Sequence, residues 1–207
     1  MGFIMAIIHR KSREIQCKIV YYGPGRGGKT TNLLMIHRAI GNRARGELIS
    51  INTAGDRTIF FDFLPMDLGA VKDLHVKISV YTVPGQVIYN DTRRLVLRGV
   101  DGLVFVADSL EIRRRQNIES LKNLEENLEA IGSDISTLPM VLQYNKRDLN
   151  GGDSPILSLE EMKNDLNPRG RWPALAASAL YGEGVKETFK KICMMTVVDV
   201  CRQLFEN

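Results

Sequence analysis

A glycine-rich run near the start of the chain has the residue types and spacing of a phosphate-binding loop. It reads Gly23-Pro24-Gly25-Arg26-Gly27-Gly28-Lys29-Thr30, the pattern GxxxxGK followed by Ser or Thr, between an apolar run and a helical pattern. Glycines let successive backbone N–H groups turn inward around the α- and β-phosphates, Lys29 can reach the β- and γ-phosphates, and the Thr30 hydroxyl can bind Mg²⁺. The expected nucleotide contacts are Gly23, Gly25, Gly27, Gly28, Lys29, Thr30 and Thr31.

A second motif predicts which base the nucleotide carries. Asn145-Lys146-Arg147-Asp148 has the form NKxD and follows an apolar run, at the end of a strand where open α/β sheets bind ligands. The Asp148 carboxylate can accept hydrogen bonds from the N1–H and 2-amino groups of guanine, a donor pair that adenine lacks. A backbone N–H of Ala177-Ser178-Ala179, after the next strand, would donate to the guanine oxygen. The expected guanine contacts are Asn145, Lys146, Asp148, Ser178 and Ala179.

A third motif, Val83-Pro84-Gly85-Gln86, lies between the first two in the chain. The Gly85 backbone N–H can bind the γ-phosphate, and the Gln86 side chain can orient the attacking water. Pro-Gly also suits a type II turn, and that backbone geometry is compatible with the chemistry. A P-loop kinase or ATPase would share the phosphate loop but not the guanine selector, so the sequence favours a guanine-nucleotide hydrolase.

Apolar runs alternate with segments of helical period, as in βαβ units around a mainly parallel sheet. The runs at 103–107 and 140–145 are apolar almost throughout and are predicted to be central strands. The runs at 47–52, 58–64 and 75–83 have no helical pattern between them and are predicted to be hairpin-like and nearer an edge. Further strands are expected at 16–22 and 173–177, and helices at 29–40, 112–131, 158–166 and 184–205. Arg93 and Arg94 fall outside these elements and are interpreted as solvent-facing charges, with partner docking as the alternative.

Composition excludes several other classes of protein. The 207 residues carry 28 Lys and Arg against 24 Asp and Glu, a net charge of +4 that is too small to indicate a nucleic-acid-binding protein. Three cysteines without metal-ligand spacing indicate neither a disulfide framework nor a zinc site, which suits a reducing cytoplasm. No apolar run reaches the length of a membrane span, and no secretory or lipidation pattern is present. We expect no direct membrane anchor.

Together the motifs resemble the Ras-like small GTPases and, more narrowly, the MglA family of bacterial gliding-motility GTPases. The resemblance covers nearly the whole chain and is carried by KIVYYGPGRGGKTTN from Lys18, DRTIFFDFLP from Asp56, YTVPGQV from Tyr81, GVDGLVFVADS from Gly99 and QYNKRDL from Gln143. It implies an α/β P-loop NTPase fold, the Ras-like G domain, with a mainly parallel sheet of six or seven strands and helices on both faces. It also implies that residues 1–207 form one such domain.

The same resemblance implies further site residues. Thr58 matches the first-switch threonine, which binds Mg²⁺ and the γ-phosphate, and Arg57 matches an arginine finger acting in cis. Ras-like families generally begin the third motif with an Asp near Mg²⁺, but Thr82 stands there in this chain, as is typical of the MglA-like group. Asp62 is a candidate to replace that acid, although its place in an apolar strand pattern suits a solvent-facing edge residue equally well.

The resemblance implies a cytoplasmic GTP/GDP switch with Mg²⁺ that controls cell polarity and gliding or pilus-based motility in a bacterium. Its expected partners are a dimeric roadblock-fold GTPase-activating protein and nucleotide-exchange and effector proteins, which would recruit a monomeric switch to a cell pole. Hydrolysis should be slow without the activating protein. Two alternatives stay open: a guanine-nucleotide-binding scaffold with negligible hydrolysis, and a GTPase switch for another intracellular transport process.

Overall fold

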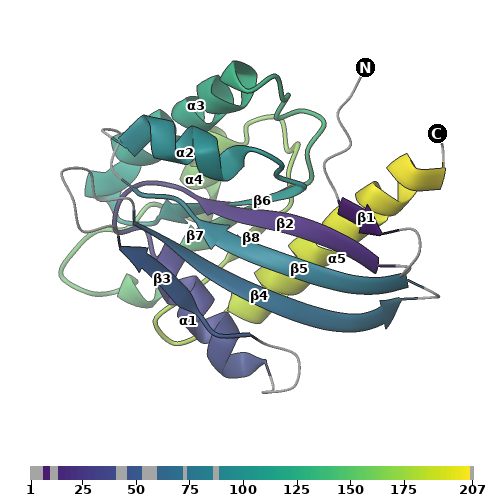
Figure 1. Cartoon of the computed structure of the whole chain (residues 1–207). Coiled ribbons are helices and arrows are strands. Elements are labelled where there is room, and N and C mark those ends of the chain that lie inside the picture. Colours follow the sequence, from purple (N-terminus) through teal and green to yellow (C-terminus); the bar gives the residue numbers. More distant parts are fainter. Residues whose placement is uncertain are drawn as a thin grey trace.

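The computed structural model describes residues 7–9, 14–40, 46–52, 60–71, 74–85 and 89–205 (Figure 1). Eight strands form one sheet within these residues. The strands are β1 (Ile7–His9), β2 (Glu14–Tyr22), β3 (Ile49–Asn52), β4 (Phe60–Val71), β5 (Leu74–Thr82), β6 (Gly102–Asp108), β7 (Met140–Asn145) and β8 (Ala174–Ala176). The α-helices are α1 (Lys29–Ala39), α2 (Asn90–Leu97), α3 (Arg114–Ala130), α4 (Leu159–Leu166) and α5 (Val185–Phe205), with short 3₁₀ turns η2 (Glu111–Arg113) and η3 (Arg147–Leu149).

The sheet order is β3-β4-β5-β2-β6-β7-β8, with β1 paired to β2. The pairs from β5 through β2, β6 and β7 to β8 are parallel, while β3, β4 and β5 form an antiparallel edge. β6 and β7 are buried along their whole length, which confirms the prediction that the apolar runs at 103–107 and 140–145 are central strands. The α/β, mainly parallel fold expected from the sequence is therefore confirmed.

Helices cover both faces of the sheet (Figure 1). On one face α1 and α5 pack through Leu33, Ile36 and Ile192 against alternate residues of β2, β6 and β7. On the other face α2, α3 and α4 bury Leu97, Leu124 and other apolar side chains against the opposite residues of the same strands. α4 begins with the expected capping box, in which Ser158 and Glu161 satisfy each other's backbone N–H groups.

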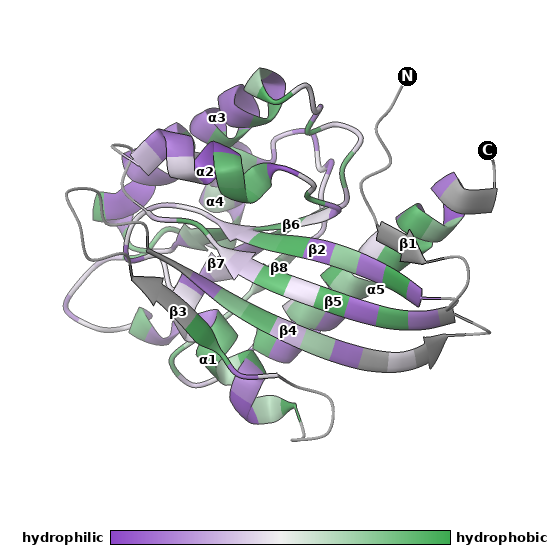
Figure 2. Ribbon diagram, in the orientation of Figure 1, coloured by the Kyte–Doolittle hydropathy of each residue, from purple (hydrophilic) through white to green (hydrophobic). Residues whose placement is uncertain are grey.

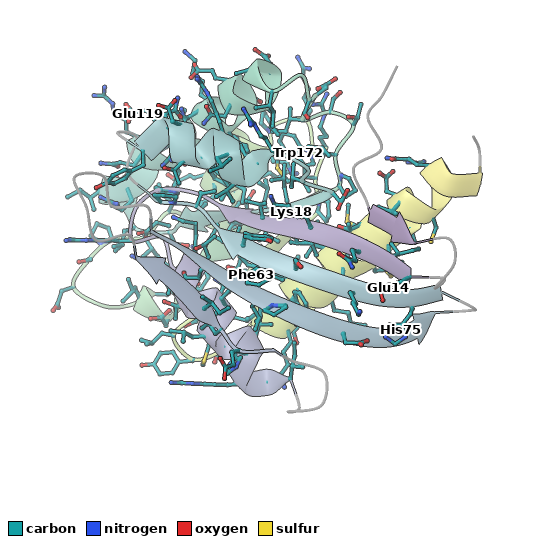
Figure 3. The ribbon with its side chains drawn as sticks, in the orientation of Figure 1. Glu14, Lys18, Phe63, His75, Glu119 and Trp172 are labelled. Atoms are coloured by element: carbon teal, nitrogen blue, oxygen red, sulfur yellow. The ribbon has the colours of Figure 1, made fainter. Side chains whose placement is uncertain are left out.

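One face of the sheet is covered less completely along the first half of β2. The first half of β2 alternates half-buried residues such as Glu14 and Lys18 with buried ones, whereas its last four residues are all buried. Figure 2 shows the corresponding alternation of polar and apolar residues along β2 and β5, and Figure 3 shows Lys18 and Phe63 on this part of the sheet. The Phe63 and Tyr81 rings stack at 4.8 Å between centroids, and the Lys18 ammonium lies 4.7 Å from the Tyr81 ring.

Several elements differ from the sequence predictions. β1 and α2 were not predicted; the sheet's ordered path has the seven strands that the prediction allows, and β1 adds an eighth among the described residues. α2 gave no apolar stripe because two of its four buried residues are Thr92 and Arg93. β4 continues past the predicted end at 64: Pro65 pairs in register with Ser79, and Gly69 lies in the bulge between Asp67 and Ala70. β5 lies two strands inside the edge. Across the described helices, none is long and apolar enough to cross a membrane.

Candidate functional site

The glycine-rich loop joins the buried end of β2 to the start of α1, the position that its motif predicts. Two of its glycines have backbone conformations that side chains rarely adopt: φ is 142° at Gly23 and 101° at Gly28, the residue that caps α1. A Cβ on Gly23 would also lie 2.2 Å from the Val106 carbonyl oxygen. The glycines therefore allow both the sharp turn and the close approach of the loop to β6.

The Lys29 side chain folds back beneath the loop. Its ammonium donates hydrogen bonds to the carbonyl oxygens of Gly23, at 3.0 Å, and Pro24, at 2.7 Å, and only 6% of the residue is exposed. Because a trans peptide points its N–H opposite to its C=O, the bond to the Pro24 oxygen leaves the Gly25 N–H facing away from the ammonium, whereas the Gly23–Pro24 peptide has no N–H. Burial, reinforced by the nearby Arg93 cation and partly offset by Asp62, lowers the pKa of Lys29 to about 7.

Three oxygen-bearing side chains meet where Mg²⁺ was expected. One carboxylate oxygen of Asp62 accepts hydrogen bonds from the Thr30 hydroxyl, at 2.7 Å, and from the Thr82 hydroxyl, at 3.0 Å. The Thr82 hydroxyl in turn accepts the Asp62 backbone N–H at 2.9 Å. Asp62 is 7% exposed, so the solvent-facing alternative is wrong for this residue. Hydroxyl and carboxylate oxygens are the protein ligands that Mg²⁺ prefers, so this donor set fits the ion.

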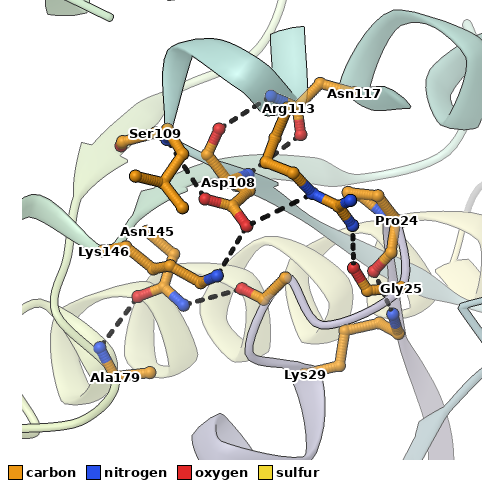
Figure 4. A network of polar contacts seen from close by, with 12 residues as sticks. Pro24, Gly25, Lys29, Asp108, Ser109, Arg113, Asn117, Asn145, Lys146 and Ala179 are labelled. Atoms are coloured by element: carbon orange, nitrogen blue, oxygen red, sulfur yellow. Dashed lines mark hydrogen bonds and ion pairs between the residues drawn. The ribbon is translucent and has the colours of Figure 1, made fainter. Parts of the chain in front are cut away.

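The base-selecting motif is linked directly to the phosphate loop. The Asn145 amide nitrogen donates to the Gly27 carbonyl oxygen at 2.8 Å, and its amide oxygen accepts the Ala179 backbone N–H at 2.8 Å (Figure 4). Asp148 lies in η3, at the same edge of the sheet, and is half-buried. The Ser178 N–H donates to the Glu183 carbonyl oxygen, so it forms part of the loop structure there.

A buried carboxylate that sequence reasoning missed fixes the second residue of this motif. Asp108, fully buried at the end of β6, accepts a hydrogen bond from the Lys146 ammonium at 2.6 Å, and the Arg113 guanidinium lies 3.9 Å from the same oxygen (Figure 4). Arg113 also donates to the Gly25 carbonyl oxygen at 2.6 Å. Asp108 is the last residue but one of the GVDGLVFVADS segment and follows its apolar run, which marks the end of a buried strand.

The third motif contacts the phosphate loop through a glycine pair. A Cβ on Gly85 would lie 2.2 Å from the Gly25 Cα atom, so the two backbones are in direct contact. Arg93, predicted to face solvent, is instead fully buried beneath this turn. It belongs to α2, the helix that the sequence did not indicate. The predicted catalytic residues Gln86 and Arg57, and the predicted Mg²⁺ ligand Thr58, lie outside the described residues.

The fold and these linked motifs define a P-loop GTPase domain of the Ras-like class. The family model of the ADP-ribosylation factor family matches residues 3–196, and the chain belongs to that family. It is 47% identical to the mutual gliding-motility protein MglA of Myxococcus xanthus over 95% of this chain and 98% of that protein. It is 27% identical to ADP-ribosylation factor-like protein 2 of Arabidopsis thaliana, over 91% and 92% of the two chains, and 26% identical to a Ras-related protein Rab7 of Prunus armeniaca, over 87% and 81%. It is therefore a small GTPase that binds guanine nucleotide and hydrolyses GTP.

Proposed function

We propose that this GTPase, as one domain over residues 1–207, is a switch for polarity and for gliding or pilus-based motility in a bacterial cell. The carrying observation is the 47% identity to a mutual gliding-motility protein over 95% of this chain, which includes all the site motifs. In this proposal GTP orders the two switch segments, and hydrolysis releases them. The switch acts in the cytoplasm and reaches a cell pole through its partners.

The proposed roles rest on geometry and charge for the described site residues, and on the family resemblance for Arg57, Thr58 and Gln86. Backbone N–H groups of the loop from Gly23 to Thr31 hold the α- and β-phosphates at the N-terminus of α1, and Lys29 neutralises the β- and γ-phosphates. Thr30, Thr58 and Asp62 hold Mg²⁺, which when bound neutralises charge on the β- and γ-phosphate oxygens. Placing an anion beside Lys29 and Arg93 relieves the repulsion between these two buried cations.

At the base site, Asp148 accepts hydrogen bonds from the guanine donors, and the hydrogen bond to Asp108 fixes the Lys146 side chain. The Ala179 N–H now donates to Asn145, so contact of this N–H with the guanine oxygen requires that hydrogen bond to be shared or exchanged. Gln86 orients the attacking water, and Arg57 stabilises charge on the transferred phosphoryl group, an effect worth about 10³ to 10⁵ in rate. A dimeric roadblock-fold activating protein positions both residues, and exchange and effector proteins complete the cycle.

Single-turnover hydrolysis tests this proposal. The purified protein with Mg²⁺ should hydrolyse GTP slowly and ATP not at all, and a roadblock-fold protein from the same genome should accelerate it. Gln86→Leu and Arg57→Ala should reduce the accelerated rate while leaving GDP affinity close to that of the unmutated protein. Tight guanine-nucleotide binding without turnover under either condition would instead favour the scaffold alternative and remove Gln86 and Arg57 from the catalytic roles.

The cellular role needs a separate test in the native bacterium. Deleting the gene should abolish directed surface movement, and the unmutated gene should restore it. Normal movement after deletion, together with a defect in vesicle-like or cargo transport, would favour the alternative role in another transport process.

A further inference from the structure

Arg93 is an unusual residue for the interior of this protein. It lies in α2, has no exposed surface and is the largest fully buried side chain in the described part of the chain. Its described hydrogen-bond partners are all neutral oxygens, from two backbone carbonyls, a tyrosine hydroxyl and an asparagine amide. Burying a cation among neutral groups costs free energy. That cost calls for a specific reason for an arginine at this place.

The guanidinium holds two consecutive carbonyl groups of the third motif. Its Nε atom donates to the Pro84 oxygen at 2.9 Å, and one terminal nitrogen donates to the Gly85 oxygen at 2.7 Å. Two donors on one planar group fix the orientation of both peptides. In the trans Pro84–Gly85 peptide the Gly85 N–H points opposite to the Pro84 C=O, so Arg93 directs this N–H away from itself.

The other side of the guanidinium is held just as firmly. Its remaining terminal nitrogen donates to the Asn123 amide oxygen of α3 at 2.5 Å and to the Tyr22 hydroxyl at 3.3 Å. The guanidinium also lies 5.1 Å from the centre of the Tyr22 ring. Tyr22 is the last residue of β2, immediately before the phosphate loop. Arg93 thus connects the strand that carries the first motif to the turn that carries the third.

The turn that Arg93 holds lies at the phosphate loop, because the Gly85 and Gly25 backbones are in contact. Arg93 is also close enough to Lys29 to help lower the pKa of that lysine, so its positive charge extends to the phosphate side of the site. A group that fixes Gly85 therefore acts at the expected place of the γ-phosphate, which GTP carries and GDP lacks.

We propose that Arg93 is a positioning residue for recognition of the γ-phosphate: it fixes the Pro84–Gly85 turn so that the Gly85 N–H is presented to that phosphate. It thereby sets how strongly the protein prefers GTP to GDP. This inference rests on the proposed contact between Gly85 and the γ-phosphate. It adds a residue of α2 to the nucleotide-sensing machinery and makes the Tyr22–Asn123 contacts its support.

Nucleotide discrimination provides the test. Affinities of the Mg²⁺ complexes of GDP and a non-hydrolysable GTP analogue are measured by fluorescence for the unmutated protein, Arg93→Lys and Arg93→Gln. Loss of the two-carbonyl contact should weaken the affinity for the GTP analogue about tenfold or more, because one charge-assisted hydrogen bond, from the Gly85 N–H to the γ-phosphate, corresponds to that factor. The affinity for GDP should change by no more than about twofold. Lysine keeps the charge but cannot form the planar pair of bonds, so Arg93→Lys should behave like Arg93→Gln.

Arg98→Gln is the matched control, since this arginine at the end of α2 is exposed to solvent. Asn123→Ala supplies a second variant that keeps Arg93 but removes its support, and it should shift the GTP-to-GDP ratio in the same direction by a smaller factor. If Arg93→Gln fails to fold, Arg93→Lys and Asn123→Ala decide the question.

If Arg93→Lys weakens GTP-analogue and GDP binding by the same factor, Arg93 only supports the fold. If neither affinity changes, the inference is overturned as well. Either result leaves the GTPase switch intact if the unmutated protein still binds GTP and hydrolyses it. An unmutated protein that binds both nucleotides equally and never hydrolyses GTP would overturn the proposed switch and this inference together.

Discussion

Asp62→Asn provides a sharp test of the site, because it removes one negative charge and preserves the size of the side chain. The Asp62 oxygen that accepts from Thr30 at 2.7 Å and Thr82 at 3.0 Å would become neutral, and an asparagine amide oxygen can still accept both bonds. We expect the fold to persist and Mg²⁺ binding to weaken.

The size of this effect can be estimated from the contacts. Asp62 reaches the expected metal ligand Thr30 directly, so it either binds Mg²⁺ or orients a group that does. Removing such a partner typically lowers metal affinity about 10- to 100-fold, or about 1.4 to 2.8 kcal/mol. A carboxylate and a doubly charged Mg²⁺ about 4 Å apart near a protein surface would interact by about 8 kcal/mol, so the estimate lies below the Coulomb limit.

The assay is a Mg²⁺ titration of the GDP complex, in which the rate of release of a fluorescent GDP is measured at each Mg²⁺ concentration. Asp67→Asn is the matched control, because Asp67 lies on the same strand but pairs with His75 at 2.8 Å on the exposed side. Thr82→Asp in the Asp62→Asn background should restore Mg²⁺ affinity at least in part, since it places a carboxylate on the residue whose hydroxyl lies 3.0 Å from the Asp62 oxygen. Identical titrations for Asp62→Asn and the unmutated protein would refute the metal role and leave Asp62 as a structural acceptor.

Three further predictions address the base site and the loop. Asp148→Asn should reduce the preference for guanine over xanthine nucleotides about tenfold or more, measured by competition, because the two guanine donors lose their charged acceptor; an unchanged preference would contradict its role. With Mg²⁺ saturating, GDP affinity should fall as pH rises above about 7, by at most about tenfold per pH unit. The reason is that the free protein loses the Lys29 proton, whereas phosphate keeps Lys29 charged in the complex. A GDP affinity that stays constant up to about pH 9 would argue against this. Asp108→Asn should lower the free energy of unfolding of the nucleotide-free protein by about 1 to 3 kcal/mol, measured in urea, because Lys146 loses its buried charged acceptor. Asp134→Asn, in an exposed turn, is the control and should have little effect. Equal losses of stability in the two variants would refute the importance of the Asp108–Lys146 pair.

Local patterns in the sequence predict much of the site. The phosphate loop requires glycines at fixed positions because the backbone itself must turn sharply and approach β6, and this requirement is written in consecutive residues. The strands at 103–107 and 140–145 are equally readable, because burial on both faces leaves a continuous apolar run. α2 gave no such signal, since its buried face carries Thr92 and Arg93, and a polar residue is read as exposed unless its partners are known.

The sequence by itself thus determined the chemistry that this protein can do, namely phosphate binding and guanine selection. It also determined the α/β fold that carries both sites. Tertiary structure alone decided which distant groups complete the site. It brings Asp62 of β4 to Thr30 and Thr82, Asp108 of β6 to Lys146, and Arg93 to the turn at Gly85. These pairs depend on strand register and helix packing. A shift of one residue in a strand would turn each side chain to the opposite face, and the chain records no local sign of which distant partner it will meet.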